Sequence, residues 1–230
     1  MRNFVILLFA ALAISCSGAA DKPANVEAEP APATATAVIY GDTIVLTQPN
    51  LAAGKTINEA LAERASSREF SAEPLSLEEL SGVVWAAAGV NRPNGHLTAP
   101  SALALYPVTV YAFTAEGVFR YNSKLHVLVR EAEGDYRELS AAQDFAYTAP
   151  LNLVYVADLS KFDSKGIDRT KAEFLAGQDA AGYAENVNLY AAGNGLKAIT
   201  RGSLKSAEVL SLLSLDPKQY VPVLAQTVGK

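Results

Sequence analysis

The sequence predicts an α+β fold in which helices flank a mainly antiparallel sheet. Three strands are predicted close together, at residues 108–114, 117–121 and 125–131, with connections short enough for hairpins. Helices precede these strands, and a long helix at residues 170–194 follows them. Helices and hairpin strands that are mixed along one chain are typical of the α+β class.

Residues 1–16 are predicted to be an export signal and not part of the fold. A short positive region precedes an apolar segment at residues 4–14, which is too short to span a bilayer comfortably. The residues that lead to the only cysteine, Cys16, resemble the lipobox of bacterial lipoproteins. Lipid on Cys16 would anchor an exported protein to a membrane on the periplasmic side, and Ser17 favours the outer membrane. A plain secretory signal, cut a few residues further on, is the alternative.

Residues 17–49 are predicted to be a tether and a lead-in to the domain. They begin with a proline- and alanine-rich tract without an apolar period, and such a tract cannot build a core. Two short apolar runs, at residues 37–40 and 43–46, are expected to be strands or lead-in segments at the domain edge. Residues 50–230 form one predicted domain, which is long enough to bury about 70 % of its unfolded surface.

The first helices of the domain are predicted from their capping residues. Thr56 is positioned to cap a first helix, and Ser76 with Glu79 forms the capping-box pattern of a second helix that runs to Gly89. The second helix carries the only tryptophan, Trp85. Packing in the core or between subunits is the favoured role of this side chain, and substrate contact is the alternative.

The long helix carries a stripe of small residues at Ala180, Ala184, Val187 and Ala191, which allows close packing against another element. Asn194-Gly195 is a suitable C-terminal cap. The other expected elements are a loop at 91–96, a short helix that starts at 100, a buried strand at 151–157, a strand at 197–200, a turn at 201–203, a helix at 206–213 and a strand at 220–228.

The sequence lacks the side chains that hydrolytic or metal chemistry requires. It contains no G-x-S-x-G, Walker or H-E-x-x-H motif, and its two histidines, His96 and His126, cannot form a metal site by themselves. His126 is expected at a surface or edge position. We therefore predict no protein catalytic residue and no metal, so an organic cofactor would carry any reaction. The net charge of −5 argues against a nucleic-acid binder.

Arg64-x-Ser66-x-Arg68 is the pattern that most clearly indicates a ligand. In an extended segment the three side chains point to one face, and on a helical turn the two arginines still lie together. Two forked guanidinium groups that converge with a hydroxyl group suit a phosphate. An ordinary solvated basic patch is the alternative that the pattern alone leaves open.

Five segments together resemble a known family. They are Arg64-x-Ser66-x-Arg68-x-Phe70, Leu77-Glu78-Glu79-Leu80 through Val84-Trp85-Ala86-Ala87, Ala99-Pro100-Ser101-Ala102 through Leu105-Tyr106-Pro107, Ala184-Glu185-Asn186-Val187 through Asn194-Gly195-Leu196, and Thr227-Val228-Gly229. In this order and spacing they resemble the nitroreductase superfamily of FMN-dependent oxidoreductases, and within it the SagB-type, azole-forming dehydrogenase branch. The resemblance covers residues 55–230.

The resemblance implies a nitroreductase-like homodimer with FMN at its interface, and the stripe of small residues fits the helix at the dimer core. The implied FMN-binding residues are Arg64, Ser66 and Arg68 for the phosphate and ribityl chain, Pro100, Ser101 and Ala102 from the partner subunit, and Thr200, Arg201 and Gly202 for the turn whose backbone N–H approaches flavin N5.

The implied function is an oxidoreductase that transfers hydride through flavin N5 to or from a small organic substrate. Nitro, quinone or azoline-like compounds are the substrate classes, and NAD(P)H or another donor would supply electrons. Leu103 stands where the family often has Gly, and Glu185 stands for its usual Gln. These departures affect the prediction of the substrate more than that of FMN. A non-catalytic flavin-fold binding or accessory lipoprotein is the alternative.

Overall fold

The computed structural model describes residues 38–230. The predicted signal peptide, Cys16 and the first part of the tether lie outside the described residues. Within the described part, no helix is long and apolar enough to cross a membrane.

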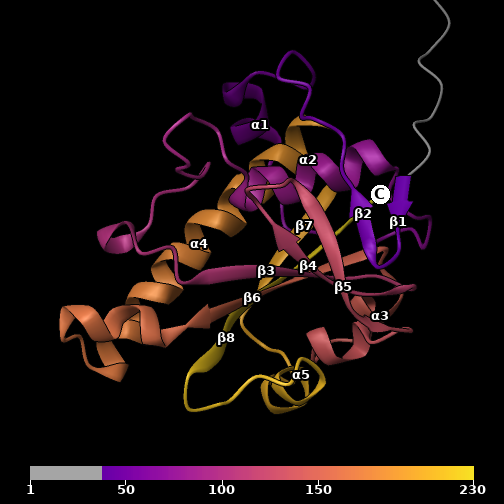
Figure 1. The fold of residues 1–230 in the computed structure, drawn as a ribbon. Helices are drawn as coiled ribbons and strands as arrows, with labels where there is room; N and C mark the ends of the chain where they lie inside the picture. The colour runs from indigo at the N-terminus through magenta and orange to yellow at the C-terminus, as the bar shows by residue number, and fades with distance from the viewer. Residues whose placement is uncertain (1–37) are drawn as a thin grey trace, which may run out of the picture. The chain divides into compact units, whose positions relative to one another are not determined.

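One antiparallel sheet of eight strands forms the centre of the fold (Figure 1). Its order across the sheet is β1-β2-β5-β4-β3-β6-β8-β7. The predicted hairpin strands are present, the two short N-terminal strands extend one edge, and the α+β class is confirmed. The bounds are β1 Val38–Tyr40, β2 Thr43–Val45, β3 Val108–Phe113, β4 Gly117–Asn122, β5 Val127–Glu133, β6 Leu151–Asp158, β7 Lys197–Arg201 and β8 Tyr220–Gly229.

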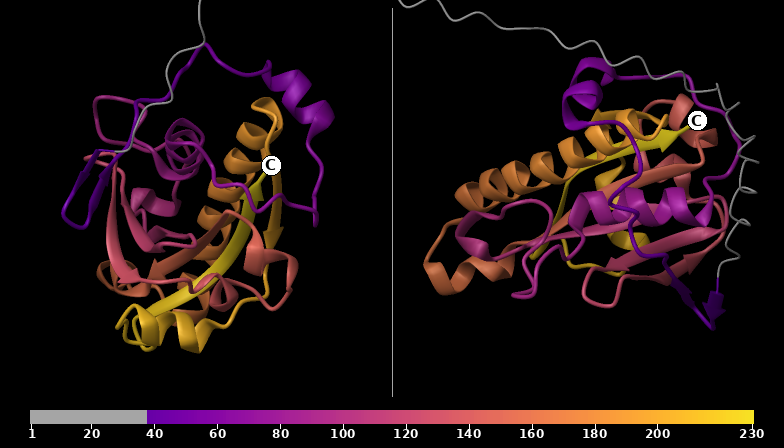
Figure 2. Two further views of the ribbon diagram at one scale, coloured as in Figure 1. Left: turned by 90° about the vertical axis from the view of Figure 1, so that its right-hand side faces the viewer. Right: turned by 90° about the horizontal axis from the view of Figure 1, so that it is seen from above.

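Helices cover both faces of this sheet. Figures 1 and 2 show α2 and α4 on one side and α5 on the other, and a separate hydrophobic cluster lies on each side. The α-helices are α1 Ile57–Glu63, α2 Leu77–Ala88, α3 Phe145–Thr148, α4 Arg169–Gly193 and α5 Ser206–Leu212, and the short 3-10 helices are η1 Ala102–Ala104, η2 Arg137–Ser140 and η3 Leu159–Lys165.

The helix ends follow the predicted capping residues. Thr56 and Glu59 form a capping box at the start of α1, and Ser76 and Glu79 form one at the start of α2. In both boxes the side chains satisfy backbone N–H groups that have no partner within the helix. Gly195, just after α4, has a φ of +74°, a conformation that glycine adopts without strain.

The stripe of small residues on α4 lies inside the chain. Ala180, Ala184, Val187 and Ala191 are each at most 1 % exposed and belong to the core cluster that α2 and the sheet complete. The resemblance had suggested that this stripe packs at a dimer core. The stripe is instead buried by packing within one chain, because its small side chains let α4 approach the sheet and α2 closely.

The contact between α2 and α4 depends on a glycine. A Cβ atom added at Gly82 on α2 would lie 1.9 Å from the Tyr190 hydroxyl oxygen on α4. Gly82 is buried, and Tyr190 is half-buried. The absence of a side chain at Gly82 therefore lets the tyrosine ring cross the neighbouring helix.

The position of His126 differs from the expectation of a surface or edge residue. The residue is 9 % exposed and lies just before β5. The Thr47 carbonyl oxygen, 2.8 Å from Nε2, can only accept, so Nε2 carries the proton and Nδ1 accepts a hydrogen bond from the Tyr121 hydroxyl at 2.8 Å. These two hydrogen bonds connect Thr47 in the lead-in segment to the sheet, and they require the imidazole ring of His126 to be neutral.

Acidification is expected to destabilise the fold through His126. Burial lowers the pKa of His126, so the unfolded chain binds a proton there more readily than the folded chain. The contribution of neutral His126 to stability is complete above its unfolded pKa of about 6.5 and is lost as the pH falls toward the folded pKa. We expect the free energy of unfolding to decrease between about pH 7 and about pH 5.

Chemical denaturation of the wild type, His126→Gln and His96→Gln across this pH range checks the assignment. His126→Gln should be less stable at about pH 7 and should have a flatter pH dependence. His96→Gln should keep the wild-type profile, because His96 lies partly exposed in a loop. An unchanged pH dependence in His126→Gln would contradict this role.

Replacing Gly82 by Ala is expected to destabilise the protein by about 1–3 kcal/mol, because the new methyl group must displace Tyr190. Gly177→Ala on α4 is the matched control. A Cβ atom there meets no atom within 4 Å, so this change should stabilise the helix by up to about 1 kcal/mol. Urea denaturation measures both values, and wild-type stability in Gly82→Ala would show that the contact can relax.

Candidate functional site

The Arg64-x-Ser66-x-Arg68 segment leaves α1 and continues as extended chain beside β7. Ser66 forms an isolated parallel bridge with Ala198, and the Ser67 N–H donates to the Ala198 carbonyl oxygen at 3.1 Å. Arg64, Ser66 and Arg68 are all exposed. Among the described residues, neither guanidinium group takes part in a hydrogen bond or an ion pair. The segment therefore presents donors that can still bind a ligand.

The same pairing brings this segment beside β7, the strand that ends just before Gly202. The bridge is parallel, so the segment runs in the direction of β7 at Ser66, and it then crosses to the end of β8, where the Ser71 N–H donates to the Lys230 carbonyl oxygen at 2.8 Å. Gly202, just beyond β7, is exposed, and a Cβ atom added there would meet no atom within 4 Å. The residues of the first predicted group and Gly202 are thus all exposed, on two segments that the bridge at Ser66 joins.

A polar network on α4 holds Thr200. The Asn188 side-chain amide donates to the Thr200 hydroxyl at 3.2 Å and to the Glu185 carboxylate at 2.9 Å. Its carbonyl oxygen accepts from Gln226 at 2.7 Å, and Gln226 in turn accepts from the Tyr155 hydroxyl at 2.6 Å. Glu185 is exposed, so its negative charge lies beside the end of β7.

Sequence reasoning did not identify Asn188 or Gln226. The spacing of Glu185 and Asn188, three residues apart, places them on one helix face, and this spacing could have predicted their hydrogen bond. Gln226 gave no such signal, because its role depends on strand pairing that only the fold shows. It is fully buried on β8, opposite Thr200.

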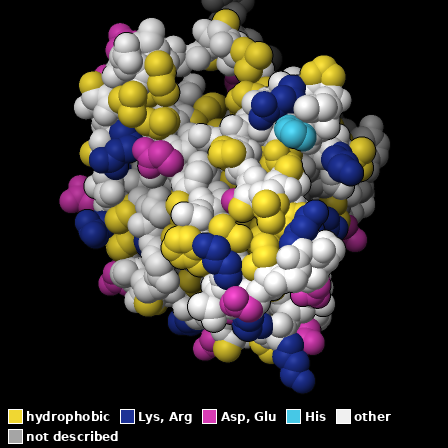
Figure 3. Space-filling view, turned by 90° about the vertical axis from the view of Figure 1, so that its left-hand side faces the viewer, with side chains coloured by type: hydrophobic (Ala, Val, Ile, Leu, Met, Phe, Trp, Pro, Cys, Tyr) yellow, Lys and Arg dark blue, Asp and Glu magenta, His cyan; other side chains and the backbone are white. Residues whose placement is uncertain are grey.

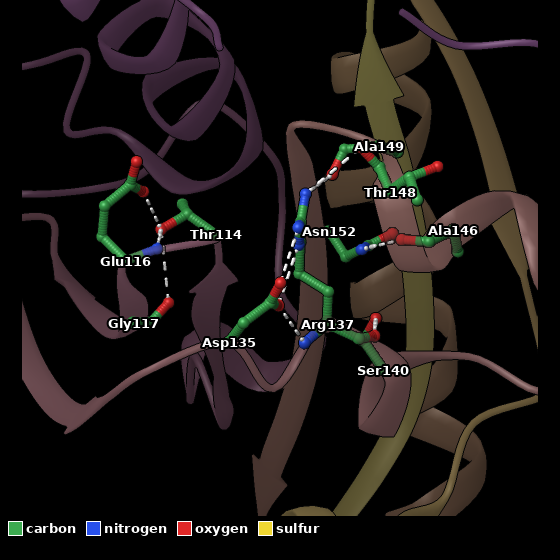
Figure 4. Close-up of polar contacts among 10 residues, drawn as sticks. All are labelled: Thr114, Glu116, Gly117, Asp135, Arg137, Ser140, Ala146, Thr148, Ala149 and Asn152. Atoms are coloured by element: carbon green, nitrogen blue, oxygen red, sulfur yellow. Dashed lines mark hydrogen bonds and ion pairs between the residues drawn. The ribbon is translucent and has the colours of Figure 1, made fainter. Parts of the chain in front are cut away.

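The Arg201 side chain points away from this surface. It is 5 % exposed, and its guanidinium group donates to Thr227 Oγ1 at 3.0 Å, to the Ser140 carbonyl oxygen at 2.8 Å and to Asn152 Oδ1 at 3.1 Å. Figure 4 shows Ser140 and Asn152 in this region. Burial lowers the pKa of Arg201 to about 10. Only the backbone of Arg201 therefore borders the candidate site.

The third predicted group, Pro100, Ser101 and Ala102, lies elsewhere in the chain. The Ser101 hydroxyl donates to the Asp179 carboxylate at 2.5 Å, and the Ala102 N–H donates to its other oxygen at 2.9 Å. At about 1.5 Å per residue, Asp179 lies about 13 Å along α4 from Asn188. A single chain therefore does not bring these residues to the surface at the end of β7.

The short helix expected from residue 100 is a 3-10 turn with a left-handed backbone. Leu103, Ala104 and Tyr106 have φ values of +55°, +54° and +46°. Leu103 thus stands at a position where glycine would be unstrained, and its side chain is 60 % exposed. The hydrogen bonds from Ser101 and Ala102 to Asp179 fix the start of this turn, since both oxygens of that buried carboxylate are used.

Most of the chain is similar to three proteins of the same kind. A candidate nitroreductase of Methanocaldococcus jannaschii is 32 % identical over 200 residues, which cover 83 % of this chain and 98 % of the relative. A candidate nitroreductase crystal structure from Ralstonia eutropha JMP134 has a TM-score of 0.76 at 34 % identity, over 84 % of this chain and 92 % of that chain. A candidate nitroreductase from Desulfovibrio desulfuricans, solved in complex with FMN, has the same fold, with a TM-score of 0.54 at 20 % identity over 76 % of this chain and 86 % of that chain.

The sequence profile described as Nitroreductase family matches residues 61–230. This range contains all three groups of predicted site residues and every strand from β3 to β8. The match spans most of the chain, and the two relatives above 30 % identity are matched over nearly their full lengths. The chain belongs to the nitroreductase family.

Proposed function

We propose that this protein is an FMN-dependent oxidoreductase and that the surface between Arg64 and Gly202 holds the cofactor. The bridge between Ser66 and Ala198 is the observation that carries this proposal, because it places the segment with the exposed arginines beside the strand that ends just before Gly202. FMN in the related Desulfovibrio desulfuricans structure supports the choice of cofactor. Bound FMN would supply hydride transfer through its N5 atom.

The donor set at this surface fits a flavin phosphate. Arg64 and Arg68 each present a forked guanidinium group, which can donate paired hydrogen bonds to phosphate oxygens. The Ser66 hydroxyl lies between them in the sequence and adds a neutral donor for the phosphate or the ribityl chain. Within the described residues these side chains have no competing partner, so binding breaks no internal contact.

The end of β7 would position the flavin ring. The absence of a side chain at Gly202 leaves room for backbone N–H groups to approach a planar ring closely. Asn188 orients the Thr200 hydroxyl from the α4 side, and the buried side chain of Arg201 fixes the strand from the other side. These residues hold and orient the cofactor, and no protein nucleophile is required.

We further propose a homodimer in which Pro100, Ser101 and Ala102 reach the site of the partner subunit. The distance along α4 separates them from the site in their own chain. Figure 3 shows hydrophobic side chains among lysine and arginine side chains on one face of the protein. Among residues 38–230, the large hydrophobic side chains that are more than half exposed are Leu51, Ile57, Leu61, Leu103, Leu125 and Phe174. A second subunit would cover some of them.

The substrate would be a small organic molecule such as a nitro, quinone or azoline-like compound, with NAD(P)H or another donor as the source of electrons. The SagB-type branch remains part of this proposal and rests on the sequence motifs. So does the location: Cys16 would carry lipid and anchor an exported protein to a membrane on the periplasmic side, with the outer membrane favoured by Ser17.

Replacing Arg64 and Arg68 by Ala is expected to weaken FMN binding strongly. A hydrogen bond to a charged group contributes about 1.5–3 kcal/mol, so losing both arginines should raise the dissociation constant by at least about 100-fold. Quenching of FMN fluorescence in a titration with the protein measures this value. Arg169→Ala is the matched control, because Arg169 is an exposed arginine at the other end of α4, where it pairs with Glu173.

Equal FMN affinity in the wild type and the double variant would refute the assignment of the phosphate site. An equal loss of affinity in Arg169→Ala would indicate a general charge effect instead. FMN that binds tightly but is reduced at no useful rate by NAD(P)H or another electron donor would favour the non-catalytic accessory role.

A further inference from the structure

Arg201 carries a buried positive charge without a counter-ion. Its guanidinium group makes four hydrogen bonds, and all of them go to neutral oxygens: Thr227 Oγ1, Asn152 Oδ1 and the carbonyl oxygens of Ser140 and Ser203. Arg201 takes part in none of the ion pairs that join described residues. The charge is therefore hydrogen-bonded but not neutralised.

The surroundings of this charge are held in place by a second arginine. Arg137 on η2 makes a paired contact with Asp135 at 2.9 and 2.6 Å and donates to the carbonyl oxygens of Thr148 and Ala149 (Figure 4). These contacts connect η2 to the end of α3. The Ser140 carbonyl oxygen that receives Arg201 belongs to the same η2 turn, so it cannot readily move away.

Asn152 and Thr227 complete a closed set of hydrogen bonds. Asn152 Nδ2 donates to the Ala146 carbonyl oxygen at 2.8 Å, which leaves Asn152 Oδ1 to accept from both Arg201 and Thr227. Asn152, Thr227 and Ser140 are all fully buried. An uncharged side chain could fill this space at lower electrostatic cost, since burial of an unpaired ion is unfavourable. The retained charge therefore calls for a role beyond packing.

The position of Arg201 in the chain suggests that role. Its backbone lies at the end of β7, directly before Gly202, and so borders the proposed flavin surface from behind. Around this guanidinium group solvent is excluded, so its field is weakly screened and acts over several ångströms. Reduction adds electrons to the flavin ring, and a nearby positive charge stabilises the resulting negative charge.

We propose that the buried charge of Arg201 raises the reduction potential of bound FMN. This inference rests on the proposed function, because it requires FMN at the end of β7. Arg201 is a positioning residue in this role: it touches the cofactor through no side-chain atom and acts through its charge. The arginine pair at residues 64 and 68 differs from it, since exposed donors to the phosphate bind both redox states of FMN similarly.

The test is the midpoint potential of FMN bound to the purified full chain, measured by spectroelectrochemical titration. Arg201→Met and Arg201→Gln should each make reduced FMN bind at least about tenfold more weakly relative to oxidised FMN, which corresponds to a potential about 30 mV lower for a two-electron couple. Arg201→Lys keeps the charge and should stay close to the wild type.

Two further variants distinguish the effect of the Arg201 charge on the potential from an effect of changed packing. Asn152→Asp is nearly isosteric and places a carboxylate beside the intact guanidinium group, so it should lower the potential while Arg201 remains. Arg169→Gln removes an exposed arginine at the other end of α4, where solvent screens the charge, and it should leave the potential unchanged. Circular dichroism establishes that each variant is folded, and the comparison of Asn152→Asp with the wild type suffices if the Arg201 variants do not fold.

Equal potentials in the wild type, Arg201→Met and Asn152→Asp would overturn the inference and leave the proposed FMN site intact. A decrease in Arg201→Lys as large as in Arg201→Met would also overturn it, because the hydrogen-bond geometry and not the charge would then be responsible. A wild-type protein that retains no FMN would overturn the proposed function, and this inference with it.

Discussion

The backbone pairing of Ser66 with Ala198 joins the segment after α1 to β7, two parts of the chain that are far apart in sequence. The hydrogen bond from Ser67 to Ala198 fixes the register of this pairing. A shift by one residue would turn Arg64, Ser66 and Arg68 to the opposite side, because side chains alternate along extended chain. The position of the phosphate donors relative to Gly202 therefore depends on this contact.

The end of β7 is held from both faces of the sheet. On one face Thr200 joins Asn188, which accepts a hydrogen bond from the buried Gln226. On the other face Arg201 joins Thr227 and Asn152. Buried polar networks that are fully hydrogen-bonded make the local structure rigid. A site built at such a strand end keeps its geometry without a ligand, which suits a cofactor that must be oriented accurately.

The parts of the structure that the sequence predicted are those with local signals. The N-cap at Thr56, the capping box at Ser76, the cap at Gly195 and the hairpin strands are each encoded within a few residues. The burial of His126 and Arg201 could not be predicted in this way. Most of their polar partners, such as Thr47 for His126 and Asn152 for Arg201, come from distant segments, and a charged or polar residue in a strand gives no sign of which side will be solvated.

The candidate site shows the same division. The spacing of Arg64, Ser66 and Arg68 indicated a ligand before the fold was known, and the family motifs placed Gly202 near it. The small-residue stripe of α4 was assigned to the wrong contact, because its pattern specifies close packing without specifying the partner. The left-handed backbone at Leu103 was likewise hidden, since leucine carries no local signal for that conformation.

The most direct test of the central claim is the visible absorption spectrum of the purified protein and of Gly202→Val after incubation with FMN and desalting. A Cβ atom at Gly202 meets no atom within 4 Å in the chain itself, so the variant should fold, but the valine side chain would occupy the place of the flavin ring. The account predicts a flavin spectrum for the wild type and none for the variant. Equal FMN retention by both proteins, or a colourless wild type, would contradict a flavin site at the end of β7.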